Sequence, residues 1–286
     1  MPEDIPPRWN RPIFIASMGR SGSTLLQRVL NVHPGITIWG EHGGFLSGVL
    51  RSYVSASQPE TANNLEIGFE SRGDVIGELG DKKAFKPWVS PFTTTDLEDE
   101  MREMVRGLFT RGLDPSIRWG FKEIRYSREE LSTLMKMFPT ASLIILARDF
   151  RGFAQSRFFA FGNTNYDFQS PEGRAAAQER LSTMSGAWIR RYQELLTVAD
   201  AHPTRASLVA YSDLVPASPR FDSLFEELRD TPPDPAAIEA VLGAKSGSSF
   251  KFNAEARENS ETLLELIDGA AIDWDEERRL ADRLGL

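Results

Sequence analysis

The stretch "PIFIASMGRSGSTLL", from Pro12 to Leu26, decides the fold. Residues 12–17 are almost all apolar, as in a strand buried in a parallel sheet, and a helical pattern starts at Ser23 and stops at Pro34. The loop between them is built of small residues, which let backbone N–H groups converge, and the helix start adds a positive dipole end. The segment predicts an anion-binding loop; the simpler alternative is a strand-to-helix turn with an N-capping serine.

Four further segments are typical of short strands: residues 36–39, 118–124, 142–147 and 206–211. Helical patterns separate most of them. This alternation predicts an α/β fold, with a P-loop-type parallel sheet flanked by helices on both faces.

A long insert, about residues 43–116, separates the second and third predicted strands. It is expected to hold two or more helices, including an acidic one near residues 96–108, and inserts of this kind often form lids. Residues 1–11 are polar and proline-rich, as in an N-terminal arm. Because no convincing linker is found, residues 1–286 are expected to form a single domain.

Composition excludes several classes of site. The chain has 286 residues and no cysteine, so disulfides and thiolate metal sites are excluded, and its three histidines make a metal site unexpected. A net charge of -8 opposes a nucleic-acid partner. No apolar run is long enough to span a membrane, and no secretory segment is found, so a cytoplasmic location is expected.

The phosphate loop departs from the common nucleotide-binding pattern. There, a glycine is followed by a lysine that reaches the outer phosphates. Here Gly22 is followed by Ser23 and Thr24, and the cation, Arg20, precedes the glycine. Thr24 could hold Mg²⁺ in a kinase, but the lysine is missing. Transfer of a sulfuryl group, which carries less charge than a phosphoryl group, needs neither the lysine nor the metal.

Here the sequence resembles the sulfotransferases that use 3'-phosphoadenosine 5'-phosphosulfate (PAPS). The segment "IFIASMGRSGSTLLQRVLNVHPGITIWGE", residues 13–41, is especially similar to the start of the tyrosylprotein sulfotransferases and related bacterial enzymes. The resemblance implies PAPS as co-substrate. It assigns binding of the 5'-phosphosulfate to loop residues Arg20, Ser21, Gly22, Ser23 and Thr24.

A second segment, "LIILARDFRGFAQS" (residues 143–156), carries Arg148 at the end of a predicted strand and Ser156 in the next helix. By resemblance, these two residues bind the 3'-phosphate. Independently, an arginine at the carboxyl end of a parallel strand is well placed to hold an anion. The alternative for Arg148 is a salt bridge to a surface carboxylate such as Asp149. Arg151 could be either a surface residue or a further phosphate contact.

Two more segments extend the resemblance. In "AYSDL" (residues 210–214), the resemblance makes Tyr211 a nucleotide contact, although it could equally be a half-buried structural tyrosine. The segment "SGSSFKFN" (residues 246–253) is similar to one that closes over the nucleotide. Ser249 and Lys251 are its candidate ligands, or it is a plain loop.

Catalysis requires a base for the acceptor hydroxyl and cations for the leaving oxygen. Glu41 directly follows the second predicted strand and matches the glutamate proposed as base in the tyrosylprotein sulfotransferases. His42 is the rival base, but neighbouring residues of an extended chain point different ways, so only one is expected to face the sulfuryl group. Lys122 and Arg20 are the predicted cations; Lys122 could instead pair with Glu123.

The acceptor stays open, because the insert and the far C-terminus match no family segment. We expect it to be a small molecule, carbohydrate or glycolipid with a hydroxyl group. The oligomeric state is not predicted. Two rival functions remain: a P-loop kinase acting on a nucleotide or small molecule, and a nucleotide-binding relative that lost catalysis.

Overall fold

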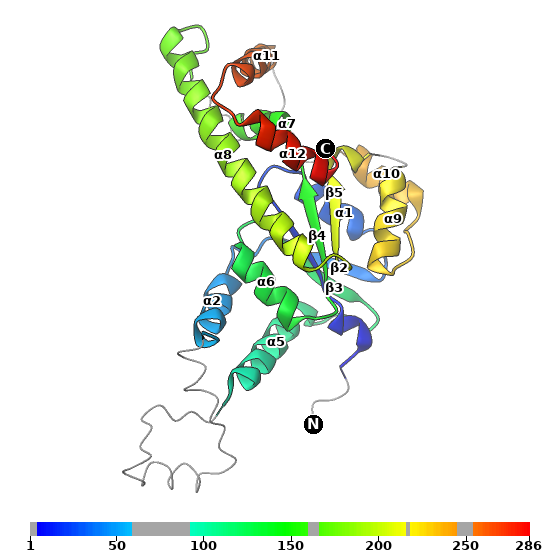
Figure 1. Cartoon of the computed structure of the whole chain (residues 1–286). Coiled ribbons are helices and arrows are strands. Elements are labelled where there is room, and N and C mark those ends of the chain that lie inside the picture. Colours follow the sequence, from blue (N-terminus) through cyan, green and yellow to red (C-terminus); the bar gives the residue numbers. More distant parts are fainter. Residues whose placement is uncertain (1–4, 59–91, 160–165, 216–217, 245–253) are drawn as a thin grey trace, which may run out of the picture.

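The computed structural model describes residues 5–58, 92–159, 166–215, 218–244 and 254–286. Its centre is one sheet of five strands (Figure 1). The strands are β1 (Ile13–Ser17), β2 (Ile36–Trp39), β3 (Arg118–Glu123), β4 (Ser142–Ala147) and β5 (Ala206–Ala210). All pair in parallel, in the order β2-β3-β1-β4-β5. The predicted α/β fold is confirmed, and every predicted strand lies within one residue of the observed bounds.

Helices connect the strands and follow the last one. They are α1 (Ser23–Leu30), α2 (Leu46–Ala56), α5 (Thr94–Thr110), α6 (Arg128–Met137), α7 (Phe150–Phe158), α8 (Pro171–Ala201), α9 (Pro219–Leu228), α10 (Pro235–Gly243), α11 (Ala254–Asp268) and α12 (Trp274–Leu284). The described residues also include two short 3-10 helices, Pro7–Asn10 and Tyr211–Asp213. In the described part of the chain, no helix is long and apolar enough to cross a membrane.

The alternation of side chains along β1 shows how the sheet is covered. Phe14 and Ala16 face the larger core, to which α5, α6 and α8 contribute, whereas Ile13 and Ile15 face a second core with α1, α9 and α10. Figure 1 shows α8 on one side of the sheet and α9 and α10 on the other. Helices therefore cover both faces, as predicted.

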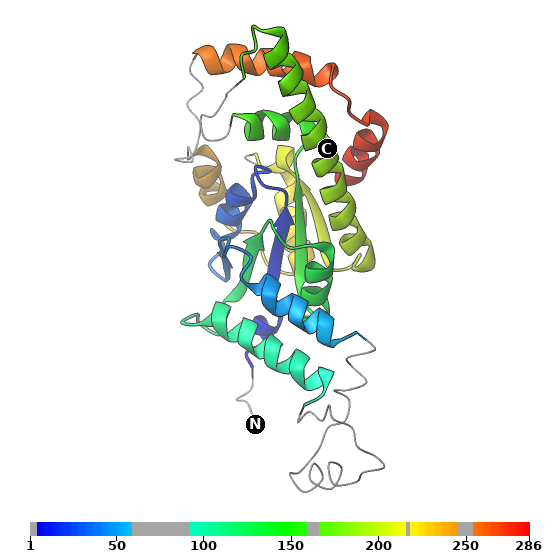
Figure 2. The same ribbon diagram turned by 90° about the vertical axis from the view of Figure 1, so that its left-hand side faces the viewer.

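The insert between β2 and β3 contributes α2 and α5 to the larger core. A capping box formed by Thr93 and Asp96 starts α5 at Thr94, two residues before the predicted acidic helix. In Figure 2 both helices lie beside the sheet, at the end opposite α7 and α11. The N-terminal arm packs as well: the indole of Trp119 donates a hydrogen bond of 2.8 Å to the carbonyl of Trp9.

A buried arginine closes the amino edge of the sheet. The side chain of Arg118, the first residue of β3, is only 1% exposed. It donates to the Arg11 carbonyl, to the Leu228 carbonyl at 2.6 Å, to Asp230 at 3.0 Å and to the Ser142 hydroxyl at 2.7 Å. Burial lowers the pKa of Arg118 to about 10, against the favourable charge of Asp230, so the group stays charged at neutral pH. This network ties the N-terminal arm and the end of α9 to the sheet.

Candidate active site

The loop between β1 and α1 lies at the carboxyl edge of the central strand. Strand order reverses between β1 and β4, and in open α/β sheets such a point is where ligands bind. Gly22 precedes α1 with a φ of 94°, and no side chain caps the helix, so the alternative of an N-capping serine is not observed. A Cβ on Gly22 would lie 2.4 Å from the Tyr211 ring. Glycine is therefore required by both the backbone and the packing.

Two buried polar atoms near this loop lack a partner among the described residues. They are the hydroxyl of Ser21, a fully buried residue, and the Nε of Arg148. Native structures rarely leave such groups unpaired, because each unpaired group costs free energy. Their presence fits a loop that binds a polar ligand rather than a plain turn.

Arg148 follows β4 and lies beside the phosphate loop. Its guanidinium stacks over the Tyr211 ring, 4.3 Å from the centroid, and its Nη1 donates to the Arg20 carbonyl at 3.4 Å. The Nε of Arg20 donates to the Ser156 hydroxyl at 3.2 Å. Four residues predicted to contact the nucleotide, from three separate segments, thus lie together. Asp149 caps α7 instead of pairing with Arg148, accepting from the Gly152 N–H at 2.7 Å.

The structure gives Arg151 a packing role. Its guanidinium pairs with Asp268 of α11 and lies over the Trp274 ring, 5.3 Å from the centroid. These contacts fix the C-terminal helices to α7, and they favour the surface interpretation over a phosphate contact. Ser249 and Lys251 lie outside the described residues.

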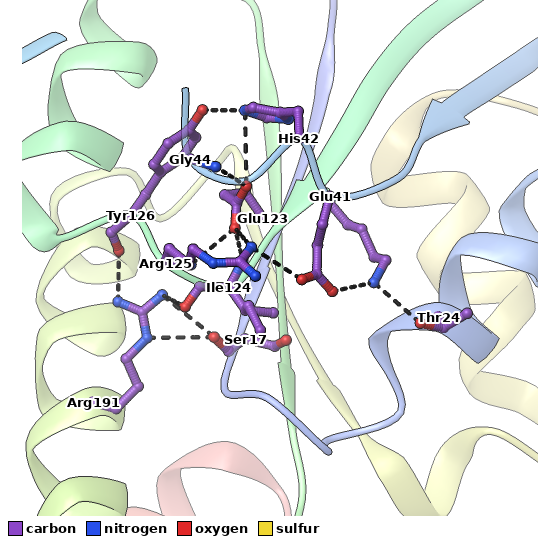
Figure 3. A network of polar contacts seen from close by, with 11 residues as sticks. Ser17, Thr24, Glu41, His42, Gly44, Glu123, Ile124, Arg125, Tyr126 and Arg191 are labelled. Carbon is purple, nitrogen blue, oxygen red and sulfur yellow. Dashed lines mark hydrogen bonds and ion pairs between the residues drawn. The ribbon is translucent and has the colours of Figure 1, made fainter. Parts of the chain in front are cut away.

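Glu41 and Lys122 form an ion pair next to the phosphate loop (Figure 3). The Nζ of Lys122 lies 2.6 Å from the Oε1 of Glu41 and donates to the Thr24 hydroxyl at 3.1 Å. Arg125 reaches the Oε2 of Glu41 at 3.1 Å. Lys122 therefore contacts both the candidate base and the phosphate loop, and the alternative pairing with Glu123 is not observed.

The charges around Glu41 set its ionisation. Burial alone would raise the pKa of Glu41, but the hydrogen bond and charge of Lys122, followed by Arg125, lower it below the ordinary value. Glu41 is consequently a carboxylate at neutral pH, ready to accept a proton.

His42 points away from the phosphate loop. Its Nε2 bonds to the Tyr126 hydroxyl and lies 3.9 Å from the Oε2 of Glu123 (Figure 3). The ring packs edge-on against Phe45 and Phe121. Burial lowers the pKa of His42, against the raising effect of Glu123. Of the two candidate bases, only Glu41 is in contact with Lys122 and through it with the loop.

Sequence reasoning missed a group of residues around Glu123. Arg191 of α8 donates to the carbonyls of Ser17, Ile124 and Tyr126, at 3.3, 3.4 and 2.7 Å. It thereby joins the end of β1 to the turn after β3. A long helix with many charged residues gave no signal that this arginine reaches the turn after β3. Only the position of Glu123, next to Lys122 on a strand, pointed to the site.

No group of three or more metal-ligating side chains is found where the structure is described. His33, the remaining histidine besides His42 and His202, accepts from the Gly35 N–H at 2.9 Å and stacks on Phe225. Its contacts are local, as in a structural histidine at a helix end.

The model of a family described as "Sulfotransferase family" matches residues 12–220. The chain belongs to the sulfotransferase family. The matched region includes the phosphate loop, Glu41, Lys122, Arg148 and Tyr211. It follows that the protein is a transferase, and the resemblance noted from its motifs is confirmed. The comparison with curated proteins gave no match.

Three solved structures are similar to this chain. The sulfotransferase domain from the curacin biosynthetic pathway is 19% identical, with a TM-score of 0.51, over 96% of this chain and 97% of that chain. A sulfotransferase from Alicyclobacillus acidocaldarius is 14% identical, with a TM-score of 0.47, over 94% and 99%. Mouse sulfotransferase SULT7A1, complexed with PAP, is 17% identical, with a TM-score of 0.44, over 96% and 83%. The curacin domain supports the sulfotransferase fold of this chain.

Proposed function

We propose that this sulfotransferase uses PAPS as donor and moves its sulfuryl group to the hydroxyl of a small-molecule, carbohydrate or glycolipid acceptor. One observation carries the proposal: two anion-binding elements, after β1 and after β4, converge at the carboxyl edge of the sheet. Arg20 and Ser156 link them at 3.2 Å. A nucleotide with phosphate groups at both the 5' and 3' positions has the charge distribution that this pair of elements fits.

The residues divide between the two ends of the nucleotide. The 5'-phosphosulfate is assigned to the N–H groups and hydroxyls of residues 21–24, with the charge of Arg20. The 3'-phosphate is assigned to Arg148 and Ser156. The unpaired Ser21 hydroxyl and Arg148 Nε supply donors for these groups. Tyr211 keeps the Arg148 guanidinium in place by stacking on it, and Ser249 and Lys251 remain predicted contacts.

Glu41 is the proposed general base. Its carboxylate takes the proton of the acceptor hydroxyl while the acceptor oxygen forms a bond to sulfur and the bond from sulfur to the bridging phosphate oxygen breaks. Negative charge then develops on that phosphate oxygen. Lys122 and Arg20 stabilise it, because both cations border the loop. The proton leaves on Glu41, and the nucleotide leaves as 3',5'-adenosine bisphosphate (PAP).

Lys122 has a special place in this scheme. It contacts the base at 2.6 Å and the loop hydroxyl of Thr24 at 3.1 Å. One cation thus borders both the proton acceptor and the leaving-group side. Holding these groups in an in-line arrangement is worth several kcal/mol, since misplacement by about 1 Å can cost roughly 100-fold in rate.

The rival functions predict different ligands. A kinase would need a lysine for the transferred phosphoryl group and Mg²⁺ on Thr24, but the Thr24 hydroxyl accepts a hydrogen bond from Lys122. A relative without catalysis would bind the nucleotide and transfer nothing. The ion pair of Glu41 with Lys122 beside the loop favours the enzyme.

Calorimetric titration with PAP tests the proposal without knowledge of the acceptor, with AMP, ADP and ATP plus Mg²⁺ as comparisons. We expect binding that depends on the 3'-phosphate and does not depend on Mg²⁺. Preference for ATP with Mg²⁺ would instead support the kinase. A panel of sugars, glycolipids, alcohols and phenols, assayed by PAP formed from PAPS, then identifies the acceptor class.

A further inference from the structure

Glu123, the last residue of β3, is a buried carboxylate whose two oxygens are both occupied. Its side chain is 1% exposed. The Oε1 accepts from the N–H groups of Ile124 and Arg125, at 3.0 and 3.2 Å, and from the Arg125 guanidinium at 2.9 Å. The Oε2 accepts from the Gly44 N–H at 2.9 Å. A buried carboxylate is costly unless it is paired and hydrogen-bonded, and this one is.

These bonds join two chain segments that are far apart in sequence. One is the turn that follows Lys122, and the other is the loop that leaves β2 and carries Glu41. That loop contains two glycines in the left-handed region, Gly43 and Gly44, with φ of 70° and 69°. Glycine backbones have wide conformational freedom, so the loop needs an external anchor to hold one shape. The bond from the Gly44 N–H to Glu123 is such an anchor.

Arg125 continues the connection to the base. Its Nη1 lies 2.9 Å from the Oε1 of Glu123 and 3.1 Å from the Oε2 of Glu41. The other oxygen of Glu41 is held by Lys122. One oxygen of Glu41 is thus held by Lys122, the residue before Glu123, and the other by Arg125, two residues after Glu123 (Figure 3).

We propose that Glu123 is a positioning residue, which fixes the base-bearing loop (residues 41–44) against Lys122 and the phosphate loop. The proposal rests on the proposed function. Glu123 does not touch the reacting atoms; it acts on Glu41 through Gly44 and Arg125. Loss of its charge would release the loop while leaving the nucleotide contacts of Arg20, Arg148 and Ser156 in place.

The first test compares Glu123→Gln with a matched control, Glu130→Gln. Glu130 is also 1% exposed, accepts from the Ser127 N–H at 2.7 Å and pairs with Arg51, but within the described chain it has no hydrogen bond or ion pair with residues 41–44. We expect Glu123→Gln to lower kcat by about 10-fold, because the base is misplaced, with the Kd for PAP within about twofold of wild type. Glu130→Gln should keep kcat within about twofold. The assay is PAP formation from PAPS with the best acceptor of the panel.

The second test places Glu123→Gln in a Glu41→Gln background. If Glu123 acts through Glu41, its substitution should lower the residual kcat by less than about twofold there, since residues that act as a unit are not additive. An equal loss in both backgrounds would overturn the positioning role. So would an unchanged kcat in the single variant.

Arg125→Met keeps the proposal testable if Glu123→Gln does not fold. The Arg125 side chain is 50% exposed, so the fold should tolerate its replacement. We expect a loss in kcat of about 5-fold that likewise vanishes in the Glu41→Gln background. Full activity of Arg125→Met would contradict the proposal. Wild-type protein that neither binds PAP nor forms it from PAPS would refute the proposed function itself. Failure of the positioning role alone would be seen only in the variants, with the wild-type protein active.

Discussion

Two arginines at opposite edges of the sheet show how burial alone fails to identify function. Arg118 lies at the amino edge and Arg148 at the carboxyl edge. The guanidinium of Arg118 donates to three backbone or hydroxyl oxygens and pairs with Asp230. In the described chain the guanidinium of Arg148 donates one hydrogen bond, of 3.4 Å, and stacks on a tyrosine, and its buried Nε has no partner.

The difference lies in which donors are satisfied. Donors that the protein satisfies itself hold the protein together, and removal of their partner leaves a buried group unpaired. Donors left unpaired cost free energy in the absence of a ligand, so they persist where a ligand completes them. By this criterion Arg118 is structural, and we propose that Arg148, which lies beside the loop between β1 and α1, belongs to a binding site.

The largest effect is expected for Arg118→Met. The change leaves the buried Asp230 with Arg8, 2.6 Å away, as its remaining cation partner among the described residues. Breaking a buried pair in this way typically costs about 3–5 kcal/mol of stability. Urea denaturation of the variant measures the loss, and titration of its folded form should give an unchanged Kd for PAP. A change in that Kd with stability retained would reverse the assignment.

Arg148→Ala should give the opposite result. We expect about 100-fold weaker binding of PAP, because a charge-assisted contact to phosphate is lost, and a Tm close to that of wild type. AMP, which lacks the 3'-phosphate, serves as the control ligand and should lose much less affinity. Equal weakening of both nucleotides would contradict the assignment of Arg148 to the 3'-phosphate.

The pH dependence of kcat distinguishes the two candidate bases, Glu41 and His42. Because the pKa of Glu41 is lowered, the base stays ionised as pH falls from 7 to 5 and is lost only below its ordinary value. At saturating nucleotide, kcat should therefore change by less than about twofold over this range. A histidine base of ordinary pKa would lose about 30-fold by pH 5, and His42, whose pKa is lowered by burial, would lose less. A loss clearly greater than about twofold over this range would favour His42 and remove Glu41 from its role.

The sequence predicted features that are local. The five strands and the loop between β1 and α1 follow from apolar runs and from small residues at fixed spacing, and the structure confirms them. The positions of Glu41 and Lys122 next to the loop followed from their places at strand ends. That residues 1–286 form one domain stays a prediction, since the family match covers residues 12–220.

The network around Glu123 could not be predicted in the same way. Its members come from β3, from the loop after β2 and, through Arg191, from α8. Their contacts depend on how a helix 31 residues long crosses the sheet, which no short motif encodes. Sequence patterns report neighbours along the chain, whereas this network joins residues more than 60 positions apart.

The smallest effect concerns backbone strain, and the chain offers a matched pair. Arg20 and Arg229 both have positive φ, 72° and 57°, a conformation that costs a residue with a side chain about 1–2 kcal/mol. Replacement by glycine relieves this cost, while the greater freedom of glycine in the unfolded chain offsets part of it. We expect both Arg20→Gly and Arg229→Gly to gain up to about 1 kcal/mol of stability in urea denaturation.

Only Arg20→Gly should weaken PAP binding, because Arg229 ends α9 and lies outside the binding site. Higher stability combined with lost affinity would show that the strained backbone of Arg20 costs stability and serves nucleotide binding. The unpaired Nε of Arg148 is explained in the same way. If Arg20→Gly were instead less stable than wild type by more than about 1 kcal/mol while Arg229→Gly gained stability, the hydrogen bond to Ser156 would outweigh the strain. Arg20 would then resemble Arg118, whose hydrogen-bond donors are paired with acceptors of the protein itself.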